Sequence, residues 1–234
     1  MKVKKAHLLF EQSGTFKKEF LRLGIPAEDY DILDIYGQTD HIIDLYGQIR
    51  GGYNEEPSIF DNMEKDDIVF AFFPCIRFES QILLWFRGDA IQQKNQTQEE
   101  KLEKDLELHK ELSENYELIT KLAVICIRKG LRLIIENPYS EQHYLTKYWA
   151  LKPSIIDKDR TQRGDSMTKP TQYWFLNCKA EQNIIFEPLD YVEHLNMIRD
   201  TWGTSAEAKA KRSLIQPQYA RRFIREFILD QEAI

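Results

Sequence analysis

Two side chains capable of covalent and acid–base chemistry come at the ends of two apolar segments. Cys75 follows residues 67–73, and Glu136 ends residues 131–136. A thiolate is a nucleophile, and a nearby carboxyl group can donate a proton or stabilise charge. If the segments form neighbouring parallel strands, both groups lie at the sheet edge where open α/β sheets bind ligands. The pair predicts covalent chemistry, although a single cysteine is also compatible with a small buried apolar residue.

The two segments have the pattern of strands that are buried on both faces. Residues 67–73 are a continuous run of mostly apolar, β-prone residues, which is typical of a central parallel strand. Pro74 cannot donate to a strand ladder, so we expect the strand to end there. Residues 131–136 end in the same way, before Asn137 and Pro138.

Strands and helices alternate along most of the chain. Further strands are expected at residues 6–10, 30–33, 42–45, 172–178 and 184–186, and helices at 16–23, 113–129 and 208–229. Alternation of this kind predicts right-handed crossovers and a mainly parallel sheet. We therefore expect one α/β domain over residues 1–234, Rossmann-like, with helices on both faces of the sheet and an antiparallel edge strand. Residues 92–115 are almost wholly polar and are expected to form a polar loop or a solvated helix, with a substrate-clamping lid as an alternative.

Composition narrows the class of protein. The chain has 234 residues, of which 42% are hydrophobic, and a formal net charge of -6, so it is not a polycation that grips nucleic acid indiscriminately. Its three widely spaced cysteines give neither a disulfide framework nor a zinc pattern, and we expect no metal. We predict no signal peptide and no membrane segment, and therefore a cytoplasmic protein without a membrane partner.

A turn after the first expected strand has the features of a ligand-binding loop. Gly14 lets the backbone pass close to a ligand, and the helix start at Phe16 is expected to offer free N–H groups to a carboxylate or phosphate. Asp31 and Asp44 fall near the ends of the next two strands. Carboxylates there can accept hydrogen bonds from ribose hydroxyls and from an adenine amino group.

At this point the chain resembles, in order, the motifs of the cytosine-5 DNA methyltransferases, a branch of the S-adenosylmethionine-dependent methyltransferases. Phe10–Phe20 with Leu23 and Gly24 resembles the first cofactor motif, and Ala71–Cys75 resembles the Pro-Pro-Cys nucleophile segment with Phe73 in place of the first proline. Ile134–Pro138 is similar to the Glu-Asn-Val segment, with Pro138 replacing valine. The last two matches are Lys169–Trp174, similar to the Lys-Pro-Thr-x-x-Trp stretch of phage-type members, and Arg212–Ile224, similar to the C-terminal motif that packs beside the cofactor.

The resemblance covers essentially the whole chain and implies a class I methyltransferase fold, with S-adenosylmethionine as cofactor. It implies that the Cys75 thiolate adds to C6 of a flipped cytosine while Glu136 stabilises charge at N3 and the 4-amino group. Arg77 is expected to lower the pKa of the thiol, with a phosphate contact or a surface charge as alternatives.

The predicted site residues fall into three groups. The catalytic residues are Cys75, Glu136 and Arg77. The expected cofactor-binding residues are Phe10, Ser13, Gly14, Thr15, Phe16, Asp31, Asp44 and Pro74. The expected substrate-binding residues are Asn137, Pro138, Arg160, Arg163, Lys169 and Thr171.

Three departures from the family pattern leave alternatives open. An acidic chain must confine its phosphate contacts to a local face, such as the C-terminal helix. The family's Gln-x-Arg-x-Arg motif is replaced by a region that offers Arg160 and Arg163 without that spacing, and residues 179–211 are a reduced substitute for the target-recognition domain. Nucleic acid, with DNA favoured, is the expected partner of this phage- or mobile-element-type chain, and a partner protein is one way to supply target recognition. The alternatives are a catalytically inactive cofactor- or DNA-binding module, and a methyltransferase acting on RNA, a free nucleotide or an exocyclic amine.

Overall fold

The strands form one sheet in the order β3-β2-β1-β4-β5-β7-β6. The computed structural model describes residues 1–79, 82–196 and 212–230. The strands are β1 (Ala6–Leu9), β2 (Ala27–Asp31), β3 (His41–Ile42), β4 (Ile68–Phe72), β5 (Arg132–Pro138), β6 (Ile155–Asp157) and β7 (Thr171–Leu176). Neighbours from β3 to β5 are parallel, whereas β7 is antiparallel to both β5 and β6. The predicted α/β class, mostly parallel sheet and antiparallel edge are confirmed.

The order of the strands reverses between β1 and β4. From β1 the chain moves outward to β2 and β3, then returns to place β4 on the other side of β1 and continues to β5. Leu9 of β1 is level with Ala71 of β4, so the loops after these two strands leave the sheet side by side. A crevice outside the strand ends at such a switch point is the usual ligand site of open α/β sheets.

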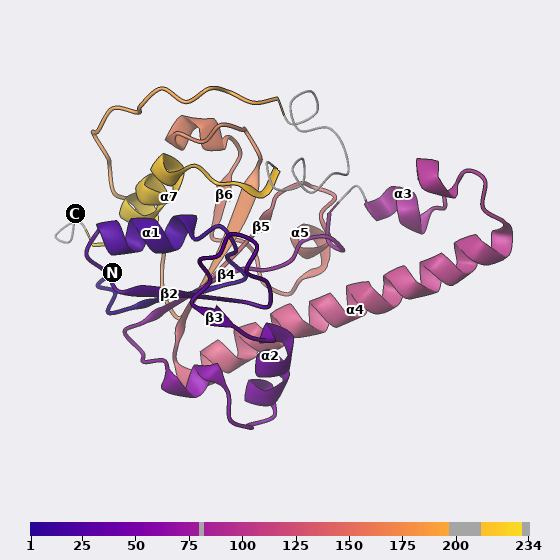
Figure 1. The fold of residues 1–234 in the computed structure, drawn as a ribbon, viewed down its shortest axis with the longest axis horizontal. Coiled ribbons are helices and arrows are strands. Elements are labelled where there is room, and N and C mark those ends of the chain that lie inside the picture. Colours follow the sequence, from indigo (N-terminus) through magenta and orange to yellow (C-terminus); the bar gives the residue numbers. More distant parts are fainter. Residues whose placement is uncertain (80–81, 197–211, 231–234) are drawn as a thin grey trace.

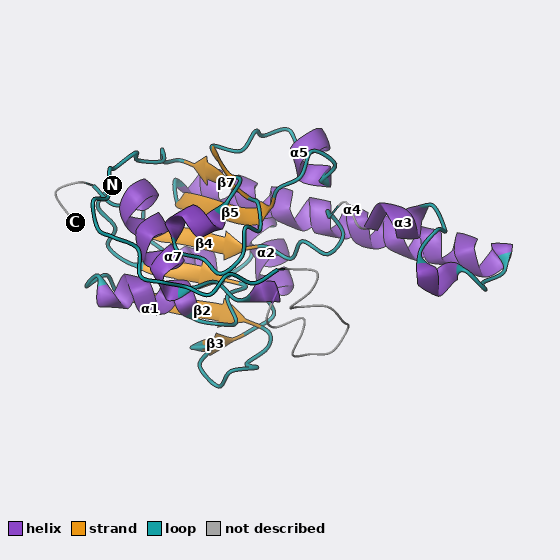
Figure 2. Ribbon diagram, turned by 90° about the horizontal axis from the view of Figure 1, so that it is seen from above, coloured by secondary structure: helices purple, strands orange, loops and turns teal. Residues whose placement is uncertain are grey.

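Helices cover both faces of the sheet (Figures 1 and 2). One face carries α1 (Thr15–Arg22), α7 (Pro217–Phe223) and the π-helical turn η4 (Ile224–Ile228), and the other carries α2 (Leu45–Tyr53) and α4 (Gln98–Lys129). Shorter elements are η1 (Ile59–Asn62), α3 (Ile82–Phe86), η2 (Ile91–Gln93), α5 (Tyr144–Tyr148) and η3 (Arg160–Arg163).

Strand residues alternate between these two layers. Phe70 of β4 packs in the core with α1 and α7, whereas its neighbour Val69 packs in the core with α2 and α4. Ile134 and Leu133 of β5 divide in the same way. Because both faces are buried, the strands read as continuous apolar runs rather than as alternating patterns.

The helix α4 has two halves with different surroundings. It contains 32 residues and is about 48 Å long. Its second half buries residues such as Leu118 and Leu122 against the sheet, whereas its first half and α3 project from the body as an arm (Figure 1). Of the two alternatives for residues 92–115, a polar loop or a solvated helix, the helix forms from Gln98 onward. The helix expected at 113–129 is not a separate element but the packed end of α4.

Several sequence-based boundaries are wrong. No strand forms at 184–186, because the carbonyl oxygens of Ile185 and Glu187 accept hydrogen bonds from Arg222 instead of a ladder partner. The strands expected at 30–33 and 42–45 end earlier, at Asp31 and Ile42. Of the helix expected at 208–229, residues up to 211 lie outside the described chain, and the described part begins its main helix at Pro217.

Across the described ranges, no helix is both long enough and apolar enough to cross a lipid bilayer.

Candidate functional site

Cys75 lies just beyond the carboxyl end of β4, on a loop that is fixed at both ends. The side-chain amide of Asn137 donates a 2.9 Å hydrogen bond to the carbonyl oxygen of Phe73. Phe78, which is 1% exposed, closes a turn by donating its backbone N–H to the Cys75 carbonyl at 2.8 Å. The residue as a whole is half-buried. The sequence thus positions a sulfur atom on a rigid loop at the predicted edge of the sheet.

Glu136 lies on the neighbouring strand and shares the surroundings of Cys75. It pairs with Phe72 in the sheet, and in its charged form it adds to the rise in the pKa of the Cys75 thiol that burial and Glu79 cause. Lys169, at the start of β7, interacts electrostatically with both groups. The structure therefore brings the predicted nucleophile and the predicted acid together. We call Cys75, Glu79, Glu136, Arg160 and Lys169 the strand-end cluster.

Burial controls the charges of this cluster. It raises the pKa of Cys75 well above its ordinary value, an effect that the Glu79 carboxylate increases and Lys169 opposes. Burial also raises the pKa of Glu136, and Lys169 and Arg160 only partly offset this. The pKa of Lys169 is lowered, by burial and by the charge of Arg160. Burial consequently favours the neutral forms of the Cys75 thiol and of the Glu136 carboxyl group over their charged forms.

Two cations complete the cluster. Lys169 donates from Nζ to the backbone oxygen of Arg212 at 2.8 Å. Arg160 is 0% exposed; one of its nitrogens pairs with Asp165, and its guanidinium carbon lies 4.5 Å from the ring centre of Tyr219. The Nε and Nη1 atoms of Arg160 have no hydrogen-bond partner among the described residues. Such buried donors without partners are uncommon, and they are suited to a ligand acceptor.

The other predicted arginines have structural partners. Arg77 forms an ion pair with Glu111 of α4, so it ties the loop after Cys75 to the arm. Arg163 makes a two-bond contact with Glu226, at 2.9 and 2.8 Å, and an ion pair with Asp157. The catalytic role of Arg77 and the substrate contact of Arg163 stay predictions.

Three further predicted substrate residues also bond within the chain. Asn137 holds the Cys75 loop as described, which leaves its buried Oδ1 without a partner. The carbonyl oxygen of Pro138 accepts from Gln172, and the Thr171 hydroxyl donates to the carbonyl of Lys169 at 2.8 Å. Contacts of these residues with a substrate stay predictions.

The loop after β1 forms the other half of the site. Phe10 has a φ of 63°, unusual for a bulky residue, and its ring packs edge-on to Phe73, the residue before Pro74, with centroids 5.3 Å apart. Gly14 has a φ of 59°, which its lack of a Cβ permits. Side chains of Ser13 and Thr15 are hydrogen-bonded across it at 3.1 Å. Strained backbone of this kind is often found at ligand sites.

One expectation for this loop is wrong. The start of α1 does not offer the N–H groups of Phe16 and Lys17 to a ligand, because the Glu11 carboxylate accepts both, at 2.6 and 3.1 Å. Glu11 is buried, which raises its pKa to about 7 even though these two bonds lower it. Glu11, which follows β1, therefore caps the start of α1 with its buried carboxylate.

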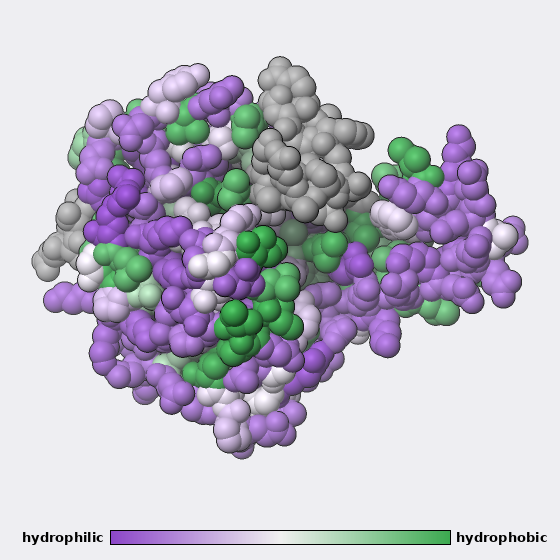
Figure 3. Space-filling model, viewed as in Figure 1, coloured by the Kyte–Doolittle hydropathy of each residue, from purple (hydrophilic) through white to green (hydrophobic). Residues whose placement is uncertain are grey.

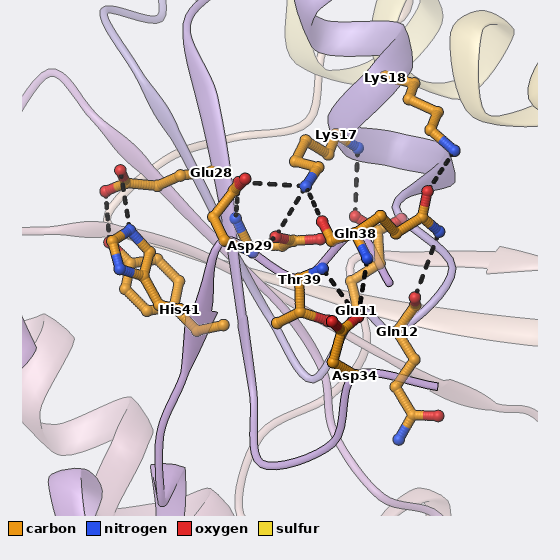
Figure 4. Close-up of polar contacts among 12 residues, drawn as sticks. Glu11, Gln12, Lys17, Lys18, Glu28, Asp29, Asp34, Gln38, Thr39 and His41 are labelled. Carbon is orange, nitrogen blue, oxygen red and sulfur yellow. Dashed lines mark hydrogen bonds and ion pairs between the residues drawn. The ribbon is translucent and has the colours of Figure 1, made fainter. Parts of the chain in front are cut away.

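A second constraint acts on the same turn from the loop between β2 and β3 (Figure 4). The Gln38 side-chain amide donates to the carbonyl of Ser13, and a Cβ on Gly14 would lie 3.3 Å from the Gln38 side chain. Lys17 joins this loop to β2 through Asp29 at 2.9 Å and the Gln38 carbonyl at 2.6 Å. Gln38 therefore fills the space next to Gly14 that the sequence suggested for a ligand.

Asp31 and Asp44 lie where the sequence predicts, at the carboxyl ends of β2 and β3. Asp31 is buried and accepts from the backbone N–H of Leu33 at 2.9 Å, and Asp44 caps α2 by accepting from Tyr46 at 3.0 Å. Oδ1 is the acceptor in both of these bonds, and Oδ1 of Asp31 also accepts from the side-chain nitrogen of Gln12 at 3.5 Å. Exposed apolar side chains follow β2 and belong to β3, namely Ile32, Leu33, Ile35 and Ile42. An apolar patch is visible near the centre of the face drawn in Figure 3.

These acceptor groups are compatible with the nucleoside half of S-adenosylmethionine, the cofactor that the resemblance implies. The two carboxylates have oxygens to accept from hydroxyl and amino groups, and the adjoining apolar side chains suit a flat base. The Gly14 turn fits less well, because Glu11 and Gln38 already use its polar groups. Asp31, Asp44 and Ile32 are the residues that would hold the cofactor.

Sequence reasoning missed Glu79, Glu11 and Gln38. Glu79 had a readable signal, since it follows Cys75 at the spacing that brings two side chains together on one helical turn. Glu11 also had one, because it directly follows a strand and precedes a helix. Gln38 had none, because its contact depends on how a long loop folds back.

Among the residues that the structure describes, no group of three or more His, Cys, Asp or Glu side chains could hold a metal ion. No protein-family model matches the chain, and no match is found among curated proteins.

Proposed function

We propose that this protein is an S-adenosylmethionine-dependent methyltransferase of the class I fold that methylates C5 of cytosine in DNA through a covalent Cys75 adduct. The observation that carries the proposal is the strand-end cluster. A cysteine, a glutamate whose pKa is raised, a lysine and an arginine meet at the carboxyl ends of β4, β5 and β6 and the amino end of β7, next to the switch point of the sheet. These are the groups that addition to a cytosine ring requires.

The chain's own residues have distinct parts in the reaction. Glu136, favoured in its protonated form, donates to N3 of the base as the sulfur of Cys75 adds to C6. The free nitrogens of Arg160 are suited to a base oxygen, in the role that the Gln-x-Arg-x-Arg arginine has in the resembling family. When bound, S-adenosylmethionine supplies the methyl group of a sulfonium ion, which C5 attacks. Asp31 and Asp44 orient that cofactor from the other side of β1.

Labelled methyl transfer tests this function. Protein is incubated with tritiated S-adenosylmethionine and cytosine-containing duplex DNA, single-stranded DNA, RNA or free nucleotide, and the methylated base is identified by chromatography. The proposal expects 5-methylcytosine in DNA. N4-methylcytosine or N6-methyladenine as the product would refute it.

One alternative has a specific observation in its favour. The described residues 179–196 contain no helix or strand and pack along α7 and η4, for example through Asn183, which donates from its backbone N–H to the Glu226 carbonyl at 3.0 Å. This segment leaves little protein to read base edges. A cofactor-binding module without turnover is therefore the second candidate, and binding of S-adenosylhomocysteine with no methyl transfer to any nucleic acid would favour it.

The exocyclic-amine alternative has less support. It needs the Asn137 side chain to accept from an amino group, and the buried Oδ1 of Asn137 has no partner among the described residues, while its amide nitrogen donates to the backbone oxygens of Phe73 and Glu136. Against it, the segment Glu136–Tyr139 lacks one proline of the Asn-Pro-Pro-Tyr motif of amino-group methyltransferases.

A further inference from the structure

Glu79 is a carboxylate of the strand-end cluster that has no role so far. The Cys75 thiol donates a hydrogen bond from Sγ to Oε1 of Glu79, with the two atoms 2.9 Å apart. The turn that joins the two residues is anchored by the buried ring of Phe78, whose carbonyl oxygen accepts from the backbone of Tyr144 at 2.8 Å. The contact is therefore built into the loop and does not depend on a flexible surface side chain.

The proposed reaction needs an acceptor for the thiol proton. The resting cluster favours the neutral thiol, whereas the thiolate is the nucleophile. Glu136 has a different part in the proposed reaction, in which it gives a proton to N3 of the base, and its raised pKa favours that part. Lys169 favours the anionic sulfur electrostatically but cannot accept a proton while it is charged. Among the described residues, Glu79 is the carboxylate that the thiol already contacts.

We propose, resting on the methyltransferase function proposed above, that Glu79 is the general base that removes the Cys75 proton as the sulfur attacks C6 of cytosine. The S–H bond breaks and its proton passes to Oε1 of Glu79, while a sulfur electron pair forms the S–C6 bond. The C5–C6 π pair becomes a C4–C5 double bond, and the former C4–N3 π pair takes the proton of Glu136. Glu79 ends neutral and Glu136 ends as a carboxylate, so total charge is conserved.

The surroundings of Glu79 also allow the proton to leave. Glu79 lines a cavity of about 320 Å³ between the Cys75 loop and the arm, together with Arg77, Trp85 and Lys104. Water in this cavity can exchange the proton between turnovers. The ion pair of Arg77 with Glu111 of α4 joins the two walls, so the arm helps to shape the space around the base.

The test compares two reactions of the same sulfur. Glu79→Gln keeps a side chain that can accept from the thiol but removes the basic carboxylate. Trapping of Cys75 on 5-fluorocytosine DNA with S-adenosylmethionine, under single-turnover conditions, measures attack on C6. Alkylation by iodoacetamide measures the thiolate fraction alone. Glu117→Gln, which removes an exposed carboxylate on α4, is the matched control, and melting temperature and S-adenosylhomocysteine binding check folding.

The two reactions are expected to change in opposite directions. Loss of the Glu79 charge should speed alkylation about fivefold at pH 7, because that charge raises the pKa of the thiol. Trapping should slow about 100-fold, the usual contribution of a general base, and should rise about tenfold per pH unit where the wild-type rate is nearly flat. Glu79→Asp should recover part of the trapping rate.

Three outcomes would overturn the proposal. Trapping by Glu79→Gln that equals the wild type, or that speeds up in step with alkylation, would mean that Glu79 only positions the thiol; the methyltransferase function would stand. Equal slowing by Glu79→Gln and Glu117→Gln would also overturn it. A wild-type protein that binds S-adenosylhomocysteine but neither traps nor methylates would refute the proposed function, and the role of Glu79 with it.

Discussion

At the end of the sheet where the parallel strands finish, the β1–β3 side and the β4–β7 side differ in how their polar groups are hydrogen-bonded. On the β1–β3 side, Glu11, Asp31 and Asp44 all accept backbone N–H groups of their own chain. On the β4–β7 side, the Glu136 carboxylate forms no hydrogen bond among the described residues, and two nitrogens of Arg160 are also without partners. On the first side the carboxylates bind local backbone and keep further oxygens that could accept from a ligand, whereas on the second side Glu136 and two nitrogens of Arg160 lack such local partners.

This difference separates groups that specify the fold from groups that await a ligand. Carboxylates that cap helices and turns stabilise local structure whether or not a ligand is present. Buried polar groups without partners are unfavourable, and native proteins retain few of them away from functional sites. Substitutions on the β4–β7 side should therefore affect turnover, and those on the β1–β3 side should affect stability and cofactor affinity.

The largest expected effect is that of Cys75→Ser. Loss of the nucleophile should reduce methyl transfer at least about 10³-fold, with the affinity for S-adenosylhomocysteine unchanged. Cys178→Ser is the control, because this other partly buried cysteine lies beyond the end of β7. The comparison fails if Cys75→Ser loses cofactor affinity and retains turnover.

Glu136→Gln should have the second-largest effect, with turnover reduced about 10²- to 10³-fold. Because the pKa of Glu136 is raised and the protonated form is the acid, wild-type turnover should be kept below that raised pKa and lost as pH rises through it. Glu136→Gln should lack this alkaline limb. Identical pH profiles for the two proteins would show that Glu136 is not the acid.

Glu11→Gln tests the β1–β3 side through the pH dependence of the free energy of unfolding. The pKa of Glu11 is raised from 4.5 to about 7, so the folded state holds a proton that the unfolded chain loses earlier. Wild-type unfolding free energy should therefore fall by up to about 3 kcal/mol between pH 4.5 and pH 7, a slope that Glu11→Gln removes. Urea titrations at pH 5 and pH 7.5 measure it, with exposed Glu141→Gln as the control. A variant slope as steep as the wild type would exclude Glu11 as its source.

Asp31→Asn should have the smallest effect, about tenfold weaker binding of S-adenosylhomocysteine with little change in turnover at saturating cofactor. Calorimetric titration measures the affinity, and Asp66→Asn, exposed and paired with Arg132 before β4, is the control. Unchanged affinity would remove Asp31 from the cofactor site.

The sequence was most informative where one physical rule dominates. Continuous apolar runs identified β4 and β5, and proline marked where the Cys75 loop begins, so the nucleophile and acid could be placed at one edge from pattern alone. The short strand β6 was not predicted, since its residues Ile155–Asp157 are too few to show a period. The sequence did not decide between a helix and a loop for the projecting half of α4, because a polar helix without a buried face has no apolar period to show.

The hydrogen-bond and ion-pair partners of the site residues were harder to predict from the sequence than the places of these residues in the fold. Arg77 was expected to lower the pKa of the Cys75 thiol, and Arg163 was expected to contact substrate. Each has a carboxylate partner far along the chain, Glu111 for Arg77 and Glu226 for Arg163. Such pairings depend on how elements pack, which residue spacing does not encode. The charge states of Cys75 and Glu136 likewise follow from burial and therefore required the structure.

The most direct test of the account is identification of the covalent adduct. Protein is incubated with S-adenosylmethionine and DNA that contains 5-fluorocytosine, digested with trypsin and nuclease, and analysed by mass spectrometry. The account predicts a single modified peptide, in which the sulfur at position 75 carries a methylated fluorocytosine nucleotide. Cofactor-dependent methylation of ordinary DNA without any such peptide would contradict it.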